Sequence, residues 1–266
     1  MFEWDKCPHL ISNLMDVKIN TTKYNWDFPL VNWGIEGSGK SMFASFMGFQ
    51  TDEHFGIKQV AIQEQQIKDC FEQSDKGQVV QVDEGGEYLF NRNWNKTENK
   101  ERVQNLFLMR TKGLIIIVNS PEIKSLDVYL RSGRLRFATN VWTRPIMSRE
   151  DDGTMRMHRE RGYFSLYSRK AIVQHFNDGY YLKPAFNERY PDITKYPEGK
   201  KFWVEYEKAS KKEKEKLMKE RGAKKETEGE VKKKDVNKLL KGFGANRVWV
   251  SEQNEKFMGD SEFPNY

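Results

Sequence analysis

The chain has 266 residues, of which 37% are hydrophobic, 32% are charged and 13% are aromatic. Its aromatic content excludes global disorder, and its length allows one sizeable α/β domain with an appendage. No apolar run approaches the roughly 18–20 residues that cross a bilayer, and the N-terminal sequence predicts no secretory signal. Two cysteines, Cys7 and Cys70, provide neither a disulfide framework nor a metal-ligand cluster. We therefore expect a cytoplasmic protein with no membrane span.

The net charge of +6 is concentrated in one segment near the C-terminus. Between Glu198 and Lys241 there are 16 basic and 10 acidic residues, which account for the whole excess and leave the remainder neutral. Such a segment is able to contact nucleic acid through its phosphates. The alternative is a solvated helix with interspersed Glu and Lys.

Strands and helices alternate in the first half of the sequence. Residues 1–28 show no strong periodicity and could supply one edge strand. Apolar patterns predict strands at 29–33, 58–63, 78–82 and 114–118, and helices from residue 42 and over 64–73 and 97–110. The fourth strand is apolar throughout, which is typical of a parallel strand buried on both faces. This order predicts an α/β fold with a parallel sheet and right-handed crossovers.

The pattern changes after residue 134. Residues 135–147 and 155–168 alternate apolar and polar side chains around an Asp-Asp-Gly turn, which predicts a β-hairpin. We expect an antiparallel β extension of the parallel core, ending in a turn-rich segment. The predicted parts are then an α/β domain at 1–198, a charged helix at 199–221, and a basic linker with a C-terminal tail at 222–266.

A phosphate-binding loop follows the first predicted strand. Residues Gly34–Ser41 (GIEGSGKS) match the pattern G-x-x-x-x-G-K-[ST] in full. Its glycines let backbone N–H groups face the phosphates, and the helix that follows offers its N-terminal partial positive charge. Lys40 is expected to bridge β- and γ-oxygens, and the Ser41 hydroxyl to bind Mg²⁺. The residues expected to contact the nucleotide are Gly34, Glu36, Gly37, Ser38, Gly39, Lys40, Ser41 and Met42.

Two carboxylates, Asp83 and Glu84, end the third predicted strand. We expect Asp83 to hold Mg²⁺ together with Ser41, and Glu84 to polarise the attacking water. An exposed acidic turn is the alternative, but the preceding loop favours the catalytic interpretation. A Glu at this place favours a hydrolase over a nucleotide kinase. GTP is disfavoured as the substrate, because residues 119–122 (NSPE) lack the guanine-reading Asn-Lys-x-Asp pattern.

Further polar residues follow the fourth predicted strand. Asn119 is placed to orient the lytic water, although an Asn that starts a turn before Pro121 would look the same. Arg131, Arg134 and Arg136 form a cluster from which one arginine could reach a neighbouring subunit's γ-phosphate. Surface arginines at a helix end are the alternative. Trp203 and Tyr206 lie at helical spacing, which indicates packing more than base stacking.

With these motifs in place, residues 29 to 207 resemble the P-loop ATPases of the FtsK/HerA class. They are most similar to the Zot-like (zonular occludens toxin-like) or viral DNA-packaging ATPases of archaeal viruses and mobile elements. The similar segments are 32–41 (NWGIEGSGKS), 82–94 (VDEGGEYLFNRNW), 105–110 (NLFLMR), 114–120 and 126–131 (LDVYLR). The resemblance implies a self-associating hexameric ring that moves double-stranded DNA at the expense of ATP. It also implies a capsid or membrane component as a further partner and, in a viral setting, the host cytoplasm as the location.

Two functions follow as hypotheses. The first is a Mg²⁺-dependent, DNA-translocating ATPase that loads a genome into a capsid or moves plasmid DNA. The second is a P-loop small-molecule kinase, or a nucleotide-switched assembly factor, without a DNA role. A kinase needs a mobile lid with several arginines, for which residues 156–161 (RMHRER) are the candidate. We interpret that segment as a hairpin strand with an exposed basic face.

Overall fold

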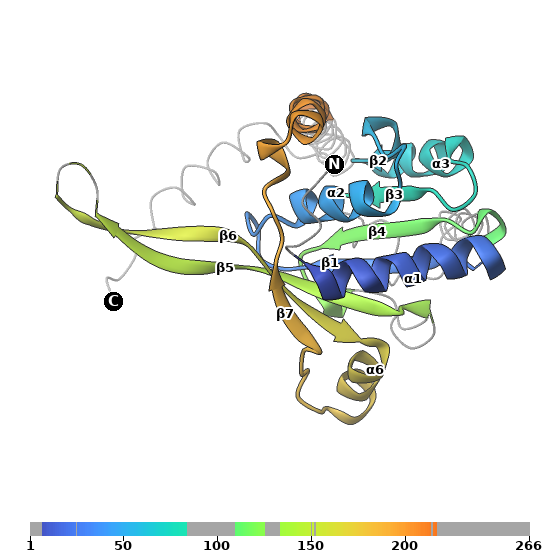
Figure 1. Cartoon of the computed structure of the whole chain (residues 1–266), viewed down its shortest axis with the longest axis horizontal. Coiled ribbons are helices and arrows are strands. Elements are labelled where there is room, and N and C mark those ends of the chain that lie inside the picture. The colour runs from blue at the N-terminus through green and yellow to red at the C-terminus, as the bar shows by residue number, and fades with distance from the viewer. Residues whose placement is uncertain are drawn as a thin grey trace, which may run out of the picture. The chain divides into compact units, whose positions relative to one another are not determined.

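The computed structural model describes residues 7–24, 26–83, 110–125, 134–149, 151, 153–213 and 215–216. The chain divides into two compact units, Met1–Ser210 and Lys211–Tyr266. The elements discussed below lie within the first unit (Figure 1). The part boundaries expected from composition, after residues 198 and 221, stay predictions.

The described strands form one seven-stranded sheet in the order β2-β3-β4-β1-β5-β6-β7. Their bounds are β1 Phe28–Trp33, β2 Val60–Ala61, β3 Val79–Val82, β4 Ile115–Ser120, β5 Phe137–Arg149, β6 Met155–Ser168 and β7 Phe186–Arg189. Strands β1 to β5 pair in parallel, whereas β6 pairs antiparallel with both β5 and β7. This confirms the predicted α/β architecture, a parallel sheet flanked by helices and extended by antiparallel strands.

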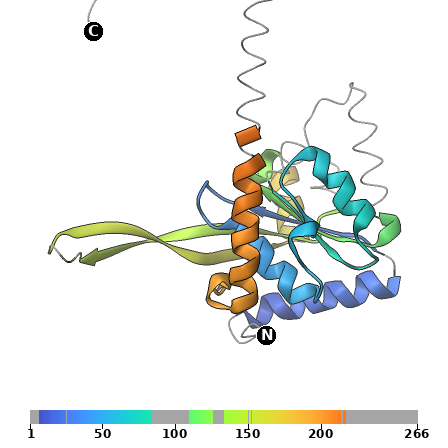
Figure 2. The ribbon, with the colours of Figure 1, turned by 90° about the horizontal axis from the view of Figure 1, so that it is seen from above.

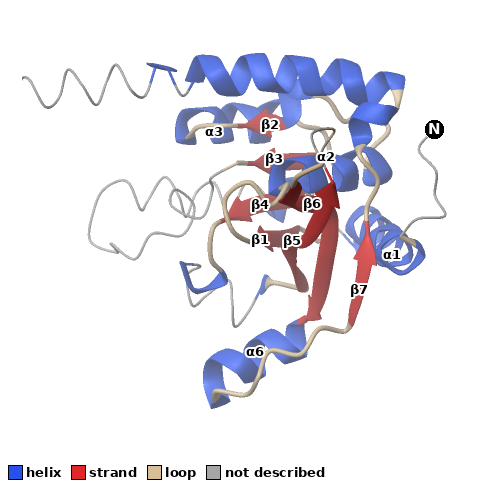
Figure 3. Cartoon of the chain, turned by 90° about the vertical axis from the view of Figure 1, so that its left-hand side faces the viewer, coloured by secondary structure: helices blue, strands red, loops and turns tan. Residues whose placement is uncertain are grey.

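Helices cover both faces of this sheet (Figure 3). Their bounds are α1 Pro8–Tyr24, α2 Lys40–Thr51, α3 Glu64–Gln73 and α6 Arg169–Asp178, and a C-terminal helix begins at residue 197. One apolar cluster joins α1, α2 and the C-terminal helix to the sheet, and the other joins α3 and α6 to it. None of the helices in the described ranges is long and apolar enough to cross a membrane.

Helix α1 contradicts the expectation that the first 28 residues supply an edge strand. Its buried side chains, Leu10, Leu14, Val17 and Thr21, are spaced by four, three and four residues, so they form one face of a helix. Polar residues such as Asn and Thr fill the remaining positions and weaken that pattern. The helix forms because the sheet offers an apolar surface that this narrow face can cover.

Other expectations are confirmed or corrected within the described residues. The hairpin and the helix over 64–73 are present, but the strand expected over 58–63 shortens to Val60–Ala61. The turn-rich segment holds strand β7, and helix α6 precedes it; neither was expected. The helix expected over 97–110 lies outside the described residues except for Arg110, which is helical.

The paired strands β5 and β6 project beyond the helices as a two-stranded arm (Figures 1 and 2). The pairing shifts register between Trp142 and Arg144, opposite Gly162, whose φ of +103° suits glycine. Such a bulge bends the strands locally and re-aims neighbouring side chains. It marks where the arm leaves the packed body, because residues beyond it on both strands are mostly exposed.

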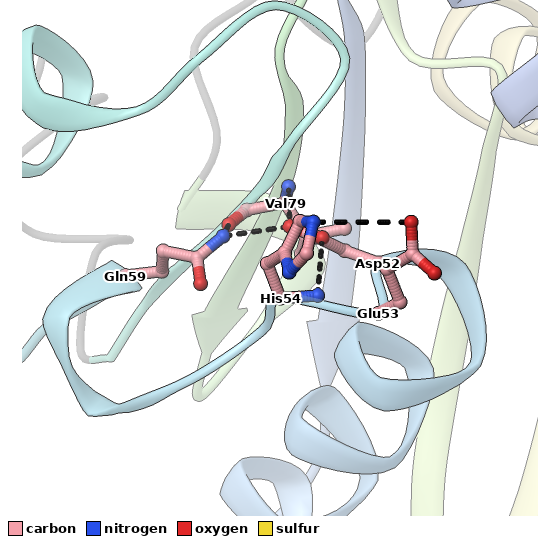
Figure 4. Close-up of polar contacts among 5 residues, drawn as sticks. All are labelled: Asp52, Glu53, His54, Gln59 and Val79. Atoms are coloured by element: carbon pink, nitrogen blue, oxygen red, sulfur yellow. Dashed lines mark hydrogen bonds and ion pairs between the residues drawn. The ribbon is translucent and has the colours of Figure 1, made fainter.

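Helix α2 and strand β3 are joined by Asp52, the residue that ends the helix (Figure 4). One carboxylate oxygen accepts hydrogen bonds from Nε2 of Gln59 at 2.7 Å and from the backbone N–H of Val79 at 3.1 Å. The other accepts the backbone N–H of His54 at 2.9 Å. Asp52 is only 6% exposed, and hydrogen bonds to a carboxylate are strong. The contact fixes α2 against the start of β3, the strand that leads to Asp83.

Candidate nucleotide-binding site

Residues 34–39 form the loop between β1 and α2, and its backbone requires glycine at both ends. Gly34 has a φ of +153°, and a Cβ there would lie 2.1 Å from the carbonyl oxygen of Val141. Gly39 has a φ of +99°, and a Cβ there would lie 2.5 Å from the hydroxyl of Tyr190. The loop conformation therefore depends on these two motif positions.

The loop is shaped to receive an anion. The Lys40 ammonium reaches back across it and donates to the carbonyl oxygens of Gly34 at 2.8 Å and Ile35 at 3.0 Å. Gly39, the N-cap of α2, has no side chain with which to cap the first N–H groups of the helix. The buried Ser38 hydroxyl has no hydrogen-bond partner in the described part of the chain. Phosphate oxygens would satisfy these donors, so the loop fits the ligand that its sequence predicts.

The strand order brings Asp83 to the same edge of the sheet as this loop. Strand β4 lies between β1 and β3, and all three run parallel. The loop follows β1 and Asp83 follows β3, so both lie at the carboxyl ends of the strands, where ligands bind in open α/β sheets. Asp83 is 5% exposed. Its backbone N–H donates to the carbonyl oxygen of Ala61 at 2.8 Å, which fixes it to β2.

Four neighbouring strands share a chain of buried polar side chains. Asn119 on β4 donates its amide to Oδ1 of Asp83, and its own oxygen accepts the amide of Asn32 on β1 at 3.1 Å. Asn32 in turn accepts the hydroxyl of Thr139 on β5. Asn32 pairs in register with both Asn119 and Thr139, so the three side chains lie on one face of the sheet. All are at most 2% exposed, where unpaired polar groups would be costly.

A tyrosine from the C-terminal helix completes the surroundings of Asp83. The Tyr206 hydroxyl donates to Oδ2 of Asp83, and the side chains of Ser41 and Ser210 lie beside it. Burial, followed by the negative charge of Asp83, raises the pKa of Tyr206 far above its ordinary value. The phenol therefore stays protonated and remains a donor to the carboxylate.

The residues present fit a magnesium ion bound together with phosphates. Mg²⁺ uses one or two carboxylates, a few hydroxyl or water oxygens and the phosphate oxygens of its substrate. Ser41 and Asp83 supply a hydroxyl and a carboxylate, and both contact the Tyr206 hydroxyl. Over the described ranges there is no group of three or more His, Cys, Asp or Glu side chains that could hold a metal ion by themselves. The site therefore suits an ion that arrives with its nucleotide.

A cavity of about 640 Å³ opens beside the loop. Its lining is Met42, Arg161, Gly162, Arg189, Tyr190, Pro191, Asp192, Lys195 and Tyr196. Tyr190 separates it from the loop: the ring is 5% exposed, and its hydroxyl donates to the carbonyl oxygen of Gly39 at 3.1 Å. Arg161 lies at the bulge of the arm, and its Cδ is 3.9 Å from where a Cβ of Gly39 would be.

Among the described arginines of the predicted cluster, Arg134 and Arg136 have partners outside this group. Glu84 and Arg131 lie outside the described residues. Arg134 forms an ion pair with Asp27, and the two side chains are 15% and 11% exposed. Burial raises the pKa of Asp27, and Arg134 opposes that shift. Arg136 is exposed and stacks over the ring of Trp26 at 5.3 Å. A role for these arginines in a neighbouring subunit stays a prediction.

Two tyrosines of this site were not singled out for it from the sequence. Tyr190 is 151 residues from Gly39, and Tyr206 is 123 residues from Asp83. Tyr206 does pack as its spacing with Trp203 indicates, since the two rings stack at 4.8 Å. No local sequence motif, however, predicts the contact of its hydroxyl with Asp83. The available signal was its place on a predicted helix within the segment that resembles P-loop ATPases.

No family model matches this sequence, and no curated protein matches it significantly. The N-terminal domain of zonular occludens toxin from Neisseria meningitidis is similar over 62% of this chain and 94% of that one, at 17% identity and a TM-score of 0.36. The AAA domain of FIGL-1 in complex with ADP is similar over 53% and 56%, at 14% identity and 0.37. A chain of the E. coli MS115-1 HORMA:CdnC:Trip13 complex is similar over 47% and 59%, at 11% identity and 0.34. The chain spans just over half the length of the last two.

Proposed function

We propose that this chain is a Mg²⁺-dependent ATPase that hydrolyses ATP to ADP and phosphate. The observation that carries the proposal is the meeting of the phosphate-binding loop with the buried carboxylate of Asp83 at one edge of the sheet. These two features are 42 or more residues apart in sequence, and strand order alone places them together. A fortuitous motif in an unrelated loop would not be followed by such a partner.

The residues of the loop would bind and orient the triphosphate. Its N–H groups and the start of α2 bind the β- and γ-oxygens, and Lys40 exchanges its carbonyl partners for phosphate oxygens. Ser41 and Asp83 would hold Mg²⁺, which when bound offsets the negative charge of the phosphates. The buried amides of Asn119 and Gln81 keep the Asp83 carboxylate in place, because both donate to its Oδ1.

Water activation is assigned to Glu84, the residue after Asp83. A carboxylate at this place accepts a proton as the water attacks the γ-phosphate. Asn119 is proposed to orient that water, and an arginine of a neighbouring copy, Arg131 or Arg134, to stabilise the charge of the transition state. These roles rest on the sequence pattern and on the burial of Asn119 beside Asp83.

The cavity beside Gly39 would hold the nucleoside end of ATP. Its volume of about 640 Å³ lies within the usual range for small-ligand sites. Met42 lines it from the first turn of α2, so a nucleotide with phosphates in the loop would extend toward it. Tyr196 offers an aromatic ring for the base, and Arg161 a guanidinium near the phosphate end.

The alternative of a small-molecule kinase gains no support from the arginine-rich segment 156–161. A kinase lid must close over the phosphates, whereas these residues belong to strand β6 and pair with β5 along the arm. Residues 156 and 159 face Ser148 and Pro145 across the pair. The segment is thus the hairpin strand that its alternation predicts, which favours hydrolysis over transfer to a second substrate.

The finer part of the proposal couples hydrolysis to the movement of double-stranded DNA by a hexameric ring that packages a viral or mobile-element genome. Three features support it: the resemblance to the packaging ATPases, the basic excess between residues 198 and 241, and the arginines on the arm. Phosphate contacts by such side chains provide affinity without sequence preference. A capsid or membrane component would then be a further partner.

One experiment tests both the ATPase activity and its coupling to DNA. ATP turnover of the full chain is measured with Mg²⁺, with and without duplex DNA, for the unaltered protein and for Lys40→Ala. We expect turnover to collapse in Lys40→Ala while its circular dichroism is retained, because the charge that holds the β- and γ-oxygens is gone. We expect DNA to raise the turnover of the unaltered protein. Near-normal hydrolysis by folded Lys40→Ala contradicts the ATPase, and a DNA-independent rate contradicts only the coupling.

A further inference from the structure

We propose that Tyr206 is a positioning residue that occupies the space between the two magnesium ligands and must move aside when the metal–nucleotide complex binds. The C-terminal helix would thereby sense whether the site is loaded. This inference rests on the proposed nucleotide site but goes beyond it, since it assigns a role to a helix that no motif connects with catalysis.

The contacts of a single hydroxyl group carry the inference. The Tyr206 hydroxyl donates to Oδ2 of Asp83, and the Ser41 side chain lies beside the same hydroxyl. These are the two side chains proposed to hold Mg²⁺, and one phenol lies next to both. An ion held by both would lie in the region where this hydroxyl now lies. Tyr206 therefore competes for the same oxygens.

Each partner also has other contacts that hold it in place. Oδ1 of Asp83 accepts from Asn119 and from Gln81, the latter at 3.3 Å, which leaves Oδ2 for the tyrosine. The side-chain oxygen of Gln81 accepts the hydroxyl of Ser45 on α2 at 2.9 Å. The carboxylate is thus preorganised on one side by the sheet and held on the other by the C-terminal helix.

The ring of Tyr206 cannot move far without its helix. It is 8% exposed and lies at 4.8 Å from the ring of Trp203 and 6.3 Å from that of Phe202, stacked on both. Phe202 in turn packs against Phe49 at 5.1 Å and Phe55 at 5.5 Å. Displacing the hydroxyl therefore disturbs a chain of aromatic contacts, and the change spreads along residues 197–210.

The energetic consequence has a definite sign. A state in which Tyr206 holds Asp83 is not competent to bind the ion, so it lowers the apparent affinity by the fraction of molecules that occupy it. Removing the hydroxyl should make the metal bind more tightly. A tyrosine that instead supported the bound ion through a water would have the opposite effect on removal. The direction in which the apparent Mg²⁺ affinity changes when the hydroxyl is removed therefore distinguishes the two possibilities.

The test is Tyr206→Phe in the full chain, which keeps the ring and its stacking but removes the hydroxyl. Binding of a fluorescent ADP analogue is titrated against Mg²⁺, with a matched titration in EDTA. We expect the Mg²⁺ concentration at half-saturation to fall about tenfold, the scale of a hydrogen bond to a charged group, while binding in EDTA is unchanged. Tyr181→Phe, at an 88% exposed position, is the control and should match the unaltered protein.

A second readout does not need the variant. Amide hydrogen exchange over residues 197–210 should accelerate in the unaltered protein when Mg²⁺ and ADP are added together, and should not respond in Lys40→Ala. The inference is overturned if Tyr206→Phe needs as much Mg²⁺ as the unaltered protein or more. It is also overturned if amide exchange over residues 197–210 does not change when Mg²⁺ and ADP are added. Neither result contradicts the nucleotide site. Failure of the unaltered protein to bind the ADP analogue at all overturns both.

Discussion

Strand β5 belongs to two different environments, and the contrast between them separates the nucleotide site from the arm. Near its start, Thr139 is 1% exposed and joins the buried polar chain that reaches Asp83. Eight residues later, Met147 is 58% exposed and pairs with Met157 on β6, which is 70% exposed. In the first environment the buried polar side chains Asn32, Asn119 and Thr139 are hydrogen-bonded to one another or to Asp83. In the second, paired side chains such as Met147 and Met157 are exposed to solvent.

The difference shows what each half of the strand can do. Buried hydrogen-bonded side chains hold a carboxylate in one position, which suits chemistry that needs preorganised groups. The arm instead presents a face that carries both methionine and arginine side chains. Its directly paired members on that face are Pro145 with Arg159, Met147 with Met157 and Arg149 with Met155. Long, adaptable side chains of this kind suit a surface that contacts another molecule.

The largest expected effect concerns catalysis on the buried side. Glu84→Gln keeps the shape of the side chain but cannot accept a proton, so we expect ATP turnover to fall at least ~10²-fold while nucleotide binding persists. Met157→Ala on the arm is the matched control and should leave basal turnover unchanged. Steady-state hydrolysis and equilibrium binding measure the two quantities. A rate within a few-fold of normal would show that Glu84 is not the base and make Glu87 the next candidate.

A second, intermediate effect concerns stability. Asn32→Ala removes the middle of the buried polar chain and leaves the oxygen of Asn119 and the hydroxyl of Thr139 without their partner. We expect the free energy of unfolding to drop by about 1–3 kcal/mol, the cost of an unsatisfied buried polar group. Met157→Ala should change it by less than about 0.5 kcal/mol. Chemical denaturation measures both, and equal losses would break the distinction between the two environments.

The smallest expected effect concerns DNA and distinguishes the arm from the C-terminal tail. Deleting residues 222–266 should weaken duplex binding and reduce the slope of log affinity against log salt by roughly 0.9 for each lost phosphate contact. Basal ATP turnover should persist, because every residue proposed to contact phosphate or metal precedes the deletion. The double variant Arg156→Gln/Arg159→Gln on the arm provides the comparison. If only the arm variant lowers the slope, the arm and not the tail carries the DNA contacts.

Local sequence patterns were sufficient for the central elements of the fold. The loop over Gly34–Ser41, the strand before Asp83 and the hairpin were each predicted from residues adjacent to them. Helix α1 was missed because only four of its residues are buried, and one of them is the polar Thr21. Strand β7 was missed because its burial alternates between intermediate and exposed, so its apolar signal is weak.

The sequence by itself predicted the residues of the site, because the phosphate-binding loop and the strand-ending carboxylate are each encoded by a short stretch of adjacent residues. Tertiary structure alone decided which groups surround them. Only the insertion of β4 between β1 and β3 brings Asn119 to Asp83. Only the docking of the C-terminal helix brings Tyr206 to the same carboxylate. Periodicity specifies local conformation and the buried face, but pairing across more than a hundred residues depends on how whole surfaces pack.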